Sequence, residues 1–391
     1  MDLESLKEYA TERQCQIIDA VILHGSNGKA AEALNTDKRG MIRTLKRAKE
    51  KAARQGWSPD HDMTHVVPST HVVKGVSTFY DEHGMPIRQW VKSDLKKQSE
   101  QEALESFVEA LKDDLPKHQP LPYKPLTGMP TELTAYIVGD AHIGMLATSK
   151  RNRGEGDWNI GIAEQVTKEA IGKLIKAAGP TDSGVLIDLG DMQHADNMQS
   201  TTTSGTQLDV DGDFGDTIAA CVRIYREAID ALLKNHNHAH VICVRGNHNS
   251  NTSRVMNVML QSFYSEEKRL TIHDNCHKYQ SLIYGNNLIV THHGDRLKAE
   301  RAQEYVARSM FKEWGLCEHR HMICGHIHHA VSKEVGGLMV EWFQALPAPD
   351  AWHSDSGYGA KRSMSAVVYD KQHGEVSRFK VNINQLGANN E

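Results

Sequence analysis

Five short apolar segments in the second half of the chain each end in a glycine that adjoins an aspartate, an asparagine or a histidine. The segments begin near residues 133, 184, 240, 287 and 321, and helical periodicity at 163–178 and 217–234 separates the first three. Parallel strands bring the residues that follow them to one edge of a sheet. The pattern therefore predicts an α/β fold with a functional site at the strand ends.

The residue types at these strand ends are those that hold pairs of divalent metal ions. Carboxylates supply charge, imidazoles supply neutral nitrogen, and an asparagine carbonyl adds a ligand without further charge. The polar residues in question are Asp140, His142, Asp191, Asn247, His248, His292, His293, His326 and His328. Adjacent residues at a strand end point to opposite sides, so only one of His292 and His293 reaches the site, and we favour His293. The adjoining glycines allow sharp turns and leave room for phosphate oxygens.

The motifs DxH, GD, GNH, HG and GHxH, in this order, resemble the five sequence blocks of the calcineurin-like metallophosphoesterases, over residues 133–380. The resemblance implies an α/β two-sheet metallophosphoesterase sandwich flanked by helices. It also implies two divalent ions, with Mn²⁺ favoured and Fe, Zn, Ni or Mg as alternatives. One ion would be held by Asp140, His142 and His328, the other by Asn247, His293 and His326, with Asp191 bridging. A hydroxide would attack phosphorus, and His248 would protonate the leaving oxygen.

Two departures from the family pattern bear on the chemistry. Asn249 stands where the family usually carries an acidic residue after GNH. Without that carboxylate, we expect His248 to be less firmly oriented and less readily protonated than in the family. In the segment GDMQHADN, His194 and Asn197 are candidates for contact with the substrate.

The N-terminal region predicts a different kind of module. Helical stretches at 11–23, 29–35 and 38–55 are separated by short breaks, an order typical of a helix-turn-helix. In the third stretch, Met41, Ile42, Leu45 and Ala48 are expected to form the buried stripe. The candidate DNA contacts on that stretch are Lys38, Arg39, Arg43, Lys46 and Arg47. A basic helix is either a solvated amphipathic helix or a surface for a polyanion, and we favour DNA binding.

Five prolines at 116–130 predict an extended connector, which divides the chain. We expect a helix-turn-helix DNA-binding domain at 1–62 and a β-hairpin with a connecting helix at 63–114. A Pro-rich linker at 115–131 and a metallophosphoesterase domain at 132–391 follow. The hairpin strands are expected at 72–80 and 86–92 and the helix at 98–112, and the hairpin is either a wing or a packing platform.

Cysteine usage and hydropathy bear on the compartment. Six scattered cysteines form no CxxC pair, and no apolar run reaches membrane-spanning length. We therefore expect a cytoplasmic protein that has DNA as its partner and no membrane contact. The amino-terminal region and the ALPAPDAWH segment resemble a group of tailed-bacteriophage proteins that fuse a helix-turn-helix to such a phosphoesterase. If the protein is encoded by a phage, the expected compartment is the cytoplasm of the host cell. Association between copies is left open, and no site for a Rad50-like partner is evident.

Two segments remain open to interpretation. Residues 197–216 form either a Ca²⁺ loop or, as we favour, a mobile rim over the metals, because they lack the length and final glutamate of an EF-hand. The aromatic residues at 341–359 either stack on bases or belong to the core. The histidines at 236, 238, 240, 319 and 321 are expected at the surface.

These features favour a two-metal phosphodiesterase, a DNA nuclease similar to the Mre11/SbcD branch, because a tethered DNA-binding helix raises the concentration of DNA at the metals. One alternative is a phosphoesterase for a small substrate, a cyclic nucleotide or a phosphoprotein, with DNA binding for regulation. Another is a catalytically weak DNA-binding scaffold, for which Asn249 is the support.

Overall fold

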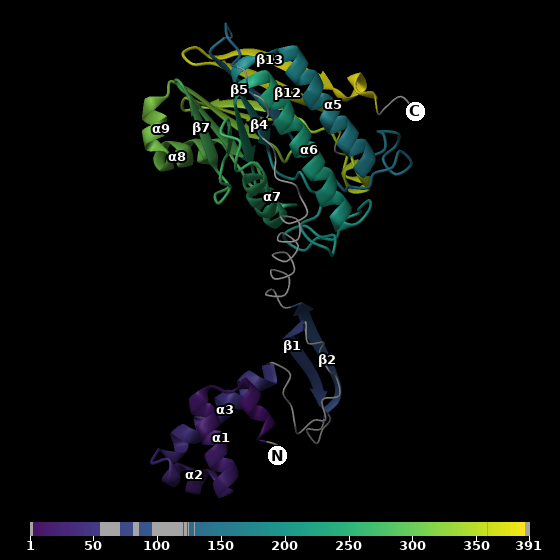
Figure 1. The fold of residues 1–391 in the computed structure, drawn as a ribbon. Helices are drawn as coiled ribbons and strands as arrows, with labels where there is room; N and C mark the ends of the chain where they lie inside the picture. Colours follow the sequence, from purple (N-terminus) through teal and green to yellow (C-terminus); the bar gives the residue numbers. More distant parts are fainter. Residues whose placement is uncertain are drawn as a thin grey trace. The chain divides into compact units, whose positions relative to one another are not determined.

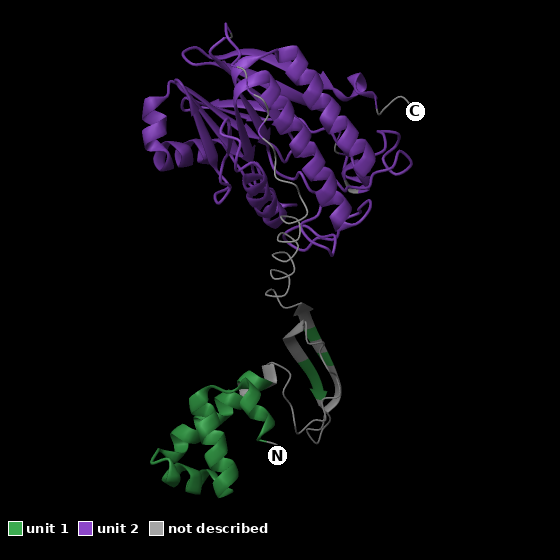
Figure 2. Ribbon diagram, viewed as in Figure 1, with its two compact units in different colours: residues 1–111 green, residues 112–391 purple. Residues whose placement is uncertain are grey.

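The computed structural model describes residues 3–54, 71–80, 86–95, 120, 123, 125–128, 130–357 and 359–387. The chain divides into two compact units, residues 1–111 and 112–391 (Figure 2). The predicted helix at 98–112 lies outside the described residues, as does the turn between the hairpin strands. Among the helices that are described, none is both long enough and apolar enough to cross a bilayer.

The first unit contains three α-helices (Figure 1), and residues from these helices form a small apolar core. The helices are α1 (Glu12–His24), α2 (Asn27–Ala33) and α3 (Lys38–Arg54), and a 3-10 helix, η1 (Ser5–Tyr9), precedes them. Helix α1 begins with a capping box, in which Thr11 and Gln14 each accept a hydrogen bond from the other's backbone N–H. It ends at Gly25, whose φ of 70° is left-handed. The three predicted helices are confirmed, with ends shifted by one or two residues.

Helix α3 separates an apolar face from a basic one. The buried face consists of Met41, Leu45, Ala48 and Ala52, which recur at the helical spacing. Ile42 is 41% exposed, so its predicted place in this stripe is wrong, because it lies about 100° around the helix from Met41. The predicted DNA contacts are all exposed: Lys38, Arg39, Arg43, Lys46 and Arg47.

The predicted hairpin strands are confirmed as β1 (His71–Tyr80) and β2 (Pro86–Leu95), which pair antiparallel. Their register places Val76 opposite Val91, and it shifts between Val73 and Gly75. Phe79 and Trp90 are both more than half exposed.

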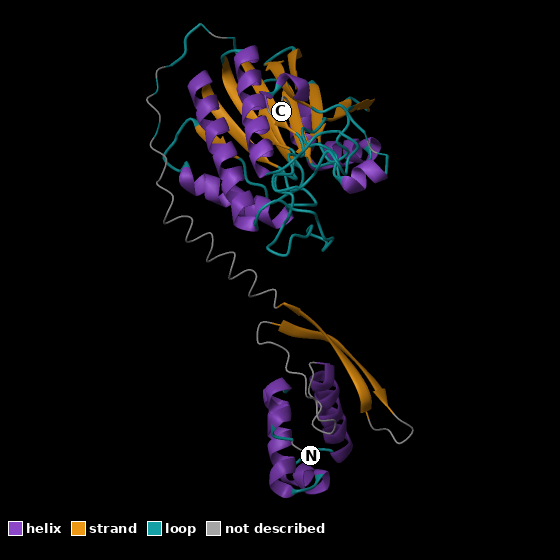
Figure 3. Cartoon of the chain, turned by 90° about the vertical axis from the view of Figure 1, so that its right-hand side faces the viewer, coloured by secondary structure: helices purple, strands orange, loops and turns teal. Residues whose placement is uncertain are grey.

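The second unit contains two sheets (Figure 3). In the six-stranded sheet the strand order is β13-β12-β3-β4-β5-β6. Its strands are β3 (Glu132–Val138), β4 (Thr181–Asp188), β5 (His236–Cys243), β6 (Leu270–Ile272), β12 (Ser363–Asp370) and β13 (Gly374–Asn382). Strands β3 to β6 run parallel, whereas β12 is antiparallel to both of its neighbours.

In the five-stranded sheet the strand order is β10-β11-β9-β8-β7. Its strands are β7 (Gln280–Tyr284), β8 (Asn287–His292), β9 (His319–Cys324), β10 (Val331–Val335) and β11 (Leu338–Trp342). Strands β8, β9 and β11 run parallel, and β7 and β10 are antiparallel edges. All five strands that precede the sequence motifs are thus members of parallel pairs.

The main core lies between the two sheets. It joins Leu133 and Val185 of the six-stranded sheet to Ile289 and Ile323 of the five-stranded sheet. Helices α5 (Ile160–Ala178) and α6 (Phe214–Asn235) pack against the six-stranded sheet (Figure 1). Helix α7 (Ser250–Phe263) packs against β6. Helix α8 (Ala299–Ser309) packs against the five-stranded sheet, and α9 (Phe311–Leu316) follows it. A short helix, α10 (Ala351–Asp355), and a 3-10 helix, η3 (Ile383–Gln385), complete the unit. The predicted two-sheet α/β sandwich with flanking helices is confirmed.

Two of the histidines expected at the surface are buried. His236 opens β5 and lies 3.1 Å from the hydroxyl of Tyr136. His321 on β9 lies 2.6 Å from the hydroxyl of Tyr369 and 3.1 Å from a carboxylate oxygen of Glu341. The predicted surface positions of His236 and His321 were both wrong. A polar stretch of sequence at the start of a strand does not reveal which hydrogen-bond partners the neighbouring strands supply.

Candidate metal centre

The polar residues of the five motifs come together at the carboxyl edges of both sheets. Three of the motifs follow β3, β4 and β5, and the other two follow β8 and β9. Within each sheet these strands run parallel, and residues after β3 and β4 lie within about 3 Å of residues after β8 and β9, so all five ends lie on the same side of the sandwich. The candidate site is therefore shared between the two sheets.

One group of potential ligands consists of Asp140, His142 and His328. The Nε2 atom of His328 lies 3.0 Å from Oδ2 of Asp140 and 3.3 Å from Nε2 of His142. Asp140 and His142 are almost completely buried. The structure thus brings together the three residues expected to hold the first ion.

A second group consists of Asp191, His293 and His326. The Nε2 atom of His293 lies 3.1 Å from Oδ2 of Asp191 and 3.2 Å from Nδ1 of His326. The same nitrogen lies 2.8 Å from the side-chain oxygen of Asn247, which adds the predicted amide ligand. The predicted second site is therefore also assembled. The bridging role of Asp191 stays a prediction, since the geometry shows it in this group alone.

The donor set fits divalent ions in charge and in tautomer. The Nδ1–H of His293 donates to the carbonyl of Leu189 at 2.9 Å, which leaves Nε2 facing Asp191, where it becomes a lone-pair donor once its proton is released. In His142, Nδ1 faces Nδ1 of His194 at 3.0 Å, while Nε2 faces the Asp140 group. A ligating histidine is held in this way, by a partner for its other ring nitrogen. Mixed carboxylate, imidazole and amide donors suit Mn, Fe, Zn or Ni.

Asp140 and His142 are held in the protonation states that metal binding requires. Burial raises the pKa of Asp140, but His293 and His328 outweigh burial and hold this pKa below its ordinary value. Burial, reinforced by the neighbouring rings of His248 and His194, holds the pKa of His142 well below its ordinary value. The carboxylate of Asp140 is therefore charged and the imidazole of His142 is neutral at neutral pH. Against the effect of burial, Asp191 and Asp140 raise the pKa of His293 to about 10, and Asp140 raises the pKa of His328, so these two imidazoles would release a proton when an ion binds.

Strained backbone conformations are concentrated at the site. Among the described residues, eight that are not glycine have a positive φ, and four of these are candidate ligands. The four are His142, Asp191, His326 and His328, with φ values of 43°, 52°, 73° and 58°. Such conformations each cost about 1–3 kcal/mol and persist only where the surrounding structure imposes them. Their presence at four candidate ligand positions is typical of a functional site.

Two glycines make room for the buried carboxylates. A Cβ atom at Gly246 would collide with the carboxylate of Asp191, and one at Gly325 would collide with that of Asp140. The glycines were expected to leave space for phosphate oxygens. At these two positions the space is occupied by the protein's own carboxylates.

His248 and Asn249 follow Asn247, and their side chains have separate partners, while the expectation that His248 is oriented and charged less well stays a prediction. Nδ1 of His248 lies 2.7 Å from the backbone carbonyl of His194. The side-chain oxygen of Asn249 instead accepts hydrogen bonds from the N–H groups of Asp191 and Gly246. Asn249 thus fixes the loops that carry Asp191 and Asn247, and the His194 carbonyl orients His248.

The two predicted substrate residues differ in placement. His194 is buried and forms a third potential ligand group with His142 and His248. Asn197 hydrogen-bonds within its own loop, to Thr201 and to the N–H of Gln199. The structure therefore brings His194 into the site, whereas the side-chain hydrogen bonds of Asn197 to described residues are within its own loop.

The loop at 197–216 is a folded segment, and its aspartates serve structural roles. Asp211 accepts a hydrogen bond from the N–H of Ile160, the first residue of α5. Asp213 and Asp216 form the capping box at the start of α6. Asp209 pairs with Arg151. Because these carboxylates are engaged separately, they do not form a Ca²⁺ loop, and the mobile rim stays a prediction.

The aromatic residues after the last motif fall into two sets. Trp342 and Phe343 are buried core residues. The Trp352 side chain and Tyr358 lie outside the described residues. Sequence reasoning missed the pair formed by His353 and Asp350, whose ring nitrogen and carboxylate oxygen lie 2.8 Å apart. Their spacing of three residues was a signal for such a contact.

Comparison with known proteins gives structural matches only. No protein-family model and no curated protein matches the sequence. Solved structures that are similar include a conserved uncharacterized protein from Streptococcus pneumoniae, described as a predicted phosphoesterase, with 10% identity and a TM-score of 0.30. That match covers 65% of this chain and 91% of the other.

Two further matches concern phosphoesterases. One is a novel archaeal phosphodiesterase, with 13% identity and a TM-score of 0.33, covering 63% of this chain and 99% of the other. The other is YfcE, a phosphoesterase from E. coli, with 15% identity and a TM-score of 0.30, covering 64% of this chain and 100% of the other.

Replacing Gly246 by alanine should displace the Asp191 carboxylate and weaken metal binding. We expect a loss of about 10- to 100-fold in Mn²⁺ affinity, measured by isothermal titration, and a loss of about 1–3 kcal/mol in stability. Gly172→Ala is the matched control, since a Cβ there meets nothing within 4 Å inside helix α5. The control should gain about 0.5–1 kcal/mol and bind Mn²⁺ unchanged. Unaltered affinity in Gly246→Ala would contradict this account of the site.

Replacing Asn249 by aspartate should not increase phosphoester hydrolysis. The Asn249 side chain contacts the Asp191 loop rather than His248, and a carboxylate there would add buried negative charge beside Asp191. We expect a rate at or below that of the unaltered protein, measured on bis-p-nitrophenyl phosphate. Asn235→Asp, at the end of α6, is the control. A several-fold gain confined to Asn249→Asp would restore the view that this position activates His248.

Proposed function

We propose that this chain is a metal-dependent phosphodiesterase of the calcineurin-like kind. More specifically, we propose that it is a DNA nuclease with an N-terminal DNA-binding module. The observation that carries the proposal is the pair of ligand groups, with one buried carboxylate in each and ring nitrogens facing it within about 3 Å. Two divalent ions in these groups would polarise an attacking water and neutralise charge on the phosphate oxygens.

The chain's own residues would perform the remaining steps. Asp140, His142 and His328 would hold one ion, and Asn247, His293 and His326 the other, with Asp191 between them. Oδ1 of Asp191 accepts the backbone N–H of His248 at 2.8 Å, which ties that histidine to the ligand groups.

His248 is placed to act as the proton donor. Its Nδ1 pairs with the His194 carbonyl, so its Nε2 is the nitrogen that would deliver a proton to the leaving oxygen. Its ring packs edge-on against His142, with centroids 4.8 Å apart, and stacks on His194. These rings restrict its orientation.

The first unit supports DNA as the substrate. Helix α3 presents five exposed basic residues opposite its buried face. A basic helix face of this kind suits the phosphate backbone. Since both units belong to one chain, DNA bound by the first would be concentrated at the second.

The first experiment measures hydrolysis by metal-stripped protein reloaded with Mn²⁺. The substrates are bis-p-nitrophenyl phosphate, labelled single- and double-stranded DNA, and cyclic nucleotides. We expect DNA cleavage that falls by about 100-fold or more in Asp191→Asn and is retained in Asp209→Asn, a surface control. If the small esters are hydrolysed and the DNA remains uncleaved, the small-substrate alternative is favoured. No turnover of any substrate would favour the scaffold.

DNA binding by α3 should show a salt dependence set by its basic residues. The double variant Arg43→Gln/Arg47→Gln should lower the slope of log K against log[salt] by about 2, because each phosphate contact contributes about 0.9. Fluorescence anisotropy of a labelled duplex measures this slope. Arg308→Gln/Lys312→Gln, two exposed positions of the second unit, is the control. Equal slopes in both double variants would exclude α3 as the DNA-binding element.

A further inference from the structure

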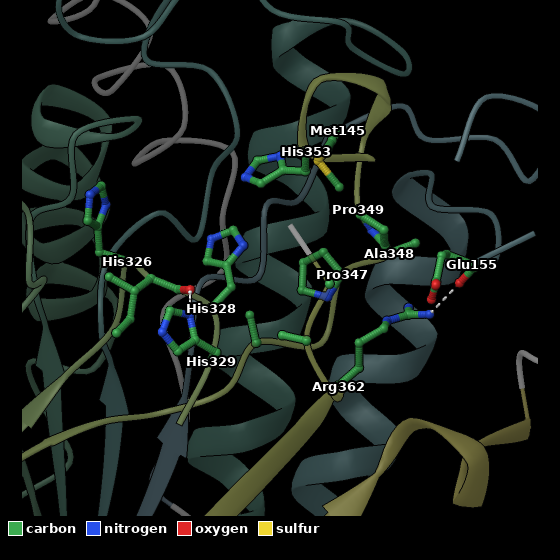
Figure 4. A pocket seen from close by; sticks show the side chains of 14 residues that line it. Met145, Glu155, His326, His328, His329, Pro347, Ala348, Pro349, His353 and Arg362 are labelled. Carbon is green, nitrogen blue, oxygen red and sulfur yellow. Dashed lines mark hydrogen bonds between the residues drawn. The ribbon is translucent and has the colours of Figure 1, made fainter. Parts of the chain in front are cut away.

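A pocket of about 320 Å³ adjoins the two ligand groups. The side chains of His326 and His328, one from each group, line one end of it, and Arg362 lies at the other end (Figure 4). A ligand in this pocket would therefore have one end at the candidate metal centre. The volume of the pocket lies at the lower limit of small-molecule sites, so the pocket matches one ring system with its substituents rather than a DNA duplex.

The walls between these ends are apolar. Pro347, Ala348 and Pro349 line one side in the segment before α10, and Met145 and Ile327 also contribute. His353 extends the flat surface of the site, because its ring stacks on that of His328 with centroids 5.4 Å apart and planes inclined by 18°. Apolar walls and a stacked ring pair favour a planar ligand over a flexible polar one.

Arg362 offers a hydrogen-bond donor at the far end. Its Nε and Nη1 atoms donate to the backbone carbonyls of Leu346 and Glu155, at 2.6 and 3.2 Å. Its Nη2 atom is buried and has no hydrogen-bond partner among the described residues, so an acceptor in the pocket would reach it after a small shift of the Arg362 side chain. Burial lowers the pKa of Arg362 to about 10, so the guanidinium is charged at neutral pH. A buried donor of this kind is stabilised when a ligand supplies an acceptor oxygen.

We propose that this pocket holds one nucleobase of the substrate, with its faces against the proline and alanine walls and a ring carbonyl oxygen at Nη2 of Arg362. The phosphate attached to that nucleoside would lie at His326 and His328. The proposal rests on the proposed phosphoesterase function and specifies its substrate class. Guanine and the pyrimidines carry a carbonyl oxygen on the base edge, whereas adenine carries none, so adenine should bind less well.

The nucleotide unit has two possible sources: a free nucleotide, or the terminal nucleotide of a single strand. Both present the same base and phosphate to the pocket. The experiment therefore includes thymidine 5′-monophosphate, adenosine 5′-monophosphate and 5′-phosphorylated tetrathymidylate, with inorganic phosphate as the ligand that tests the metal centre alone.

The test is isothermal titration of the full-length, Mn²⁺-loaded protein with these four ligands. Ala360→Trp fills the pocket from an exposed lining position, and Lys361→Trp is the matched control at an exposed position outside the lining. We expect thymidine monophosphate to bind at least 10-fold more tightly than phosphate, and adenosine monophosphate to bind less tightly than thymidine monophosphate. Ala360→Trp should abolish the advantage of thymidine monophosphate over phosphate while leaving phosphate affinity unchanged. Lys361→Trp should alter neither.

The outcomes separate this proposal from the one on which it rests. If phosphate binds but the nucleotides bind no more tightly, or if Ala360→Trp leaves their affinity intact, the base pocket is wrong and the metal centre stands. If phosphate does not bind to the metal-loaded protein, both proposals fail. A loss of tetrathymidylate affinity in Ala360→Trp would identify a strand end as the occupant. A loss of affinity in Ala360→Trp that is confined to thymidine monophosphate would identify a free nucleotide as the occupant.

Discussion

Two buried carboxylates, those of Asp140 and Asp191, impose the strongest constraint on this molecule. Each is almost completely removed from water and lies within about 3 Å of an imidazole nitrogen. A buried carboxylate is stable only with compensating charge or hydrogen bonds. Here the imidazoles come from residues that follow strands of the other sheet, and Asp191 also accepts the N–H of His248, which follows β5 of its own sheet. Asp140 accepts the backbone N–H of His326 with both oxygens, at 3.0 and 2.8 Å. The carboxylates therefore link the two sheets at the site.

The local backbone is adapted to this requirement. Four candidate ligands have left-handed φ values, and two glycines are necessary because a side chain would overlap a carboxylate. Asn249 contributes by holding the N–H groups of Asp191 and Gly246 together. The surrounding sandwich supplies the free energy that keeps these strained turns in place, which is the usual relation between a rigid scaffold and a functional site.

The two units contribute different kinds of recognition to the proposed function. The exposed basic face of α3 suits contacts with phosphate, which hold nucleic acid without distinguishing its sequence. The pocket between His328 and Arg362 suits a single base and its phosphate. A substrate that satisfies both is a nucleic acid strand with an accessible nucleotide. A substrate that satisfies only the second is a free nucleotide.

The sequence by itself determined the α/β class of the second unit, the main elements and which residues gather in the candidate ligand groups, because a strand followed by Gly and a potential metal-binding side chain is a local pattern repeated five times. It did not determine which polar residues support those ligands. Asn249 proved to contact Asp191 rather than His248, His236 and His321 proved to be buried, and Ile42 proved to be exposed. Only the tertiary structure decided these points, and it alone placed Arg362 across a pocket from His328. The physical reason is that hydrogen-bond partners and burial depend on residues far apart in the chain, whereas strand ends and helix faces follow from neighbours in sequence.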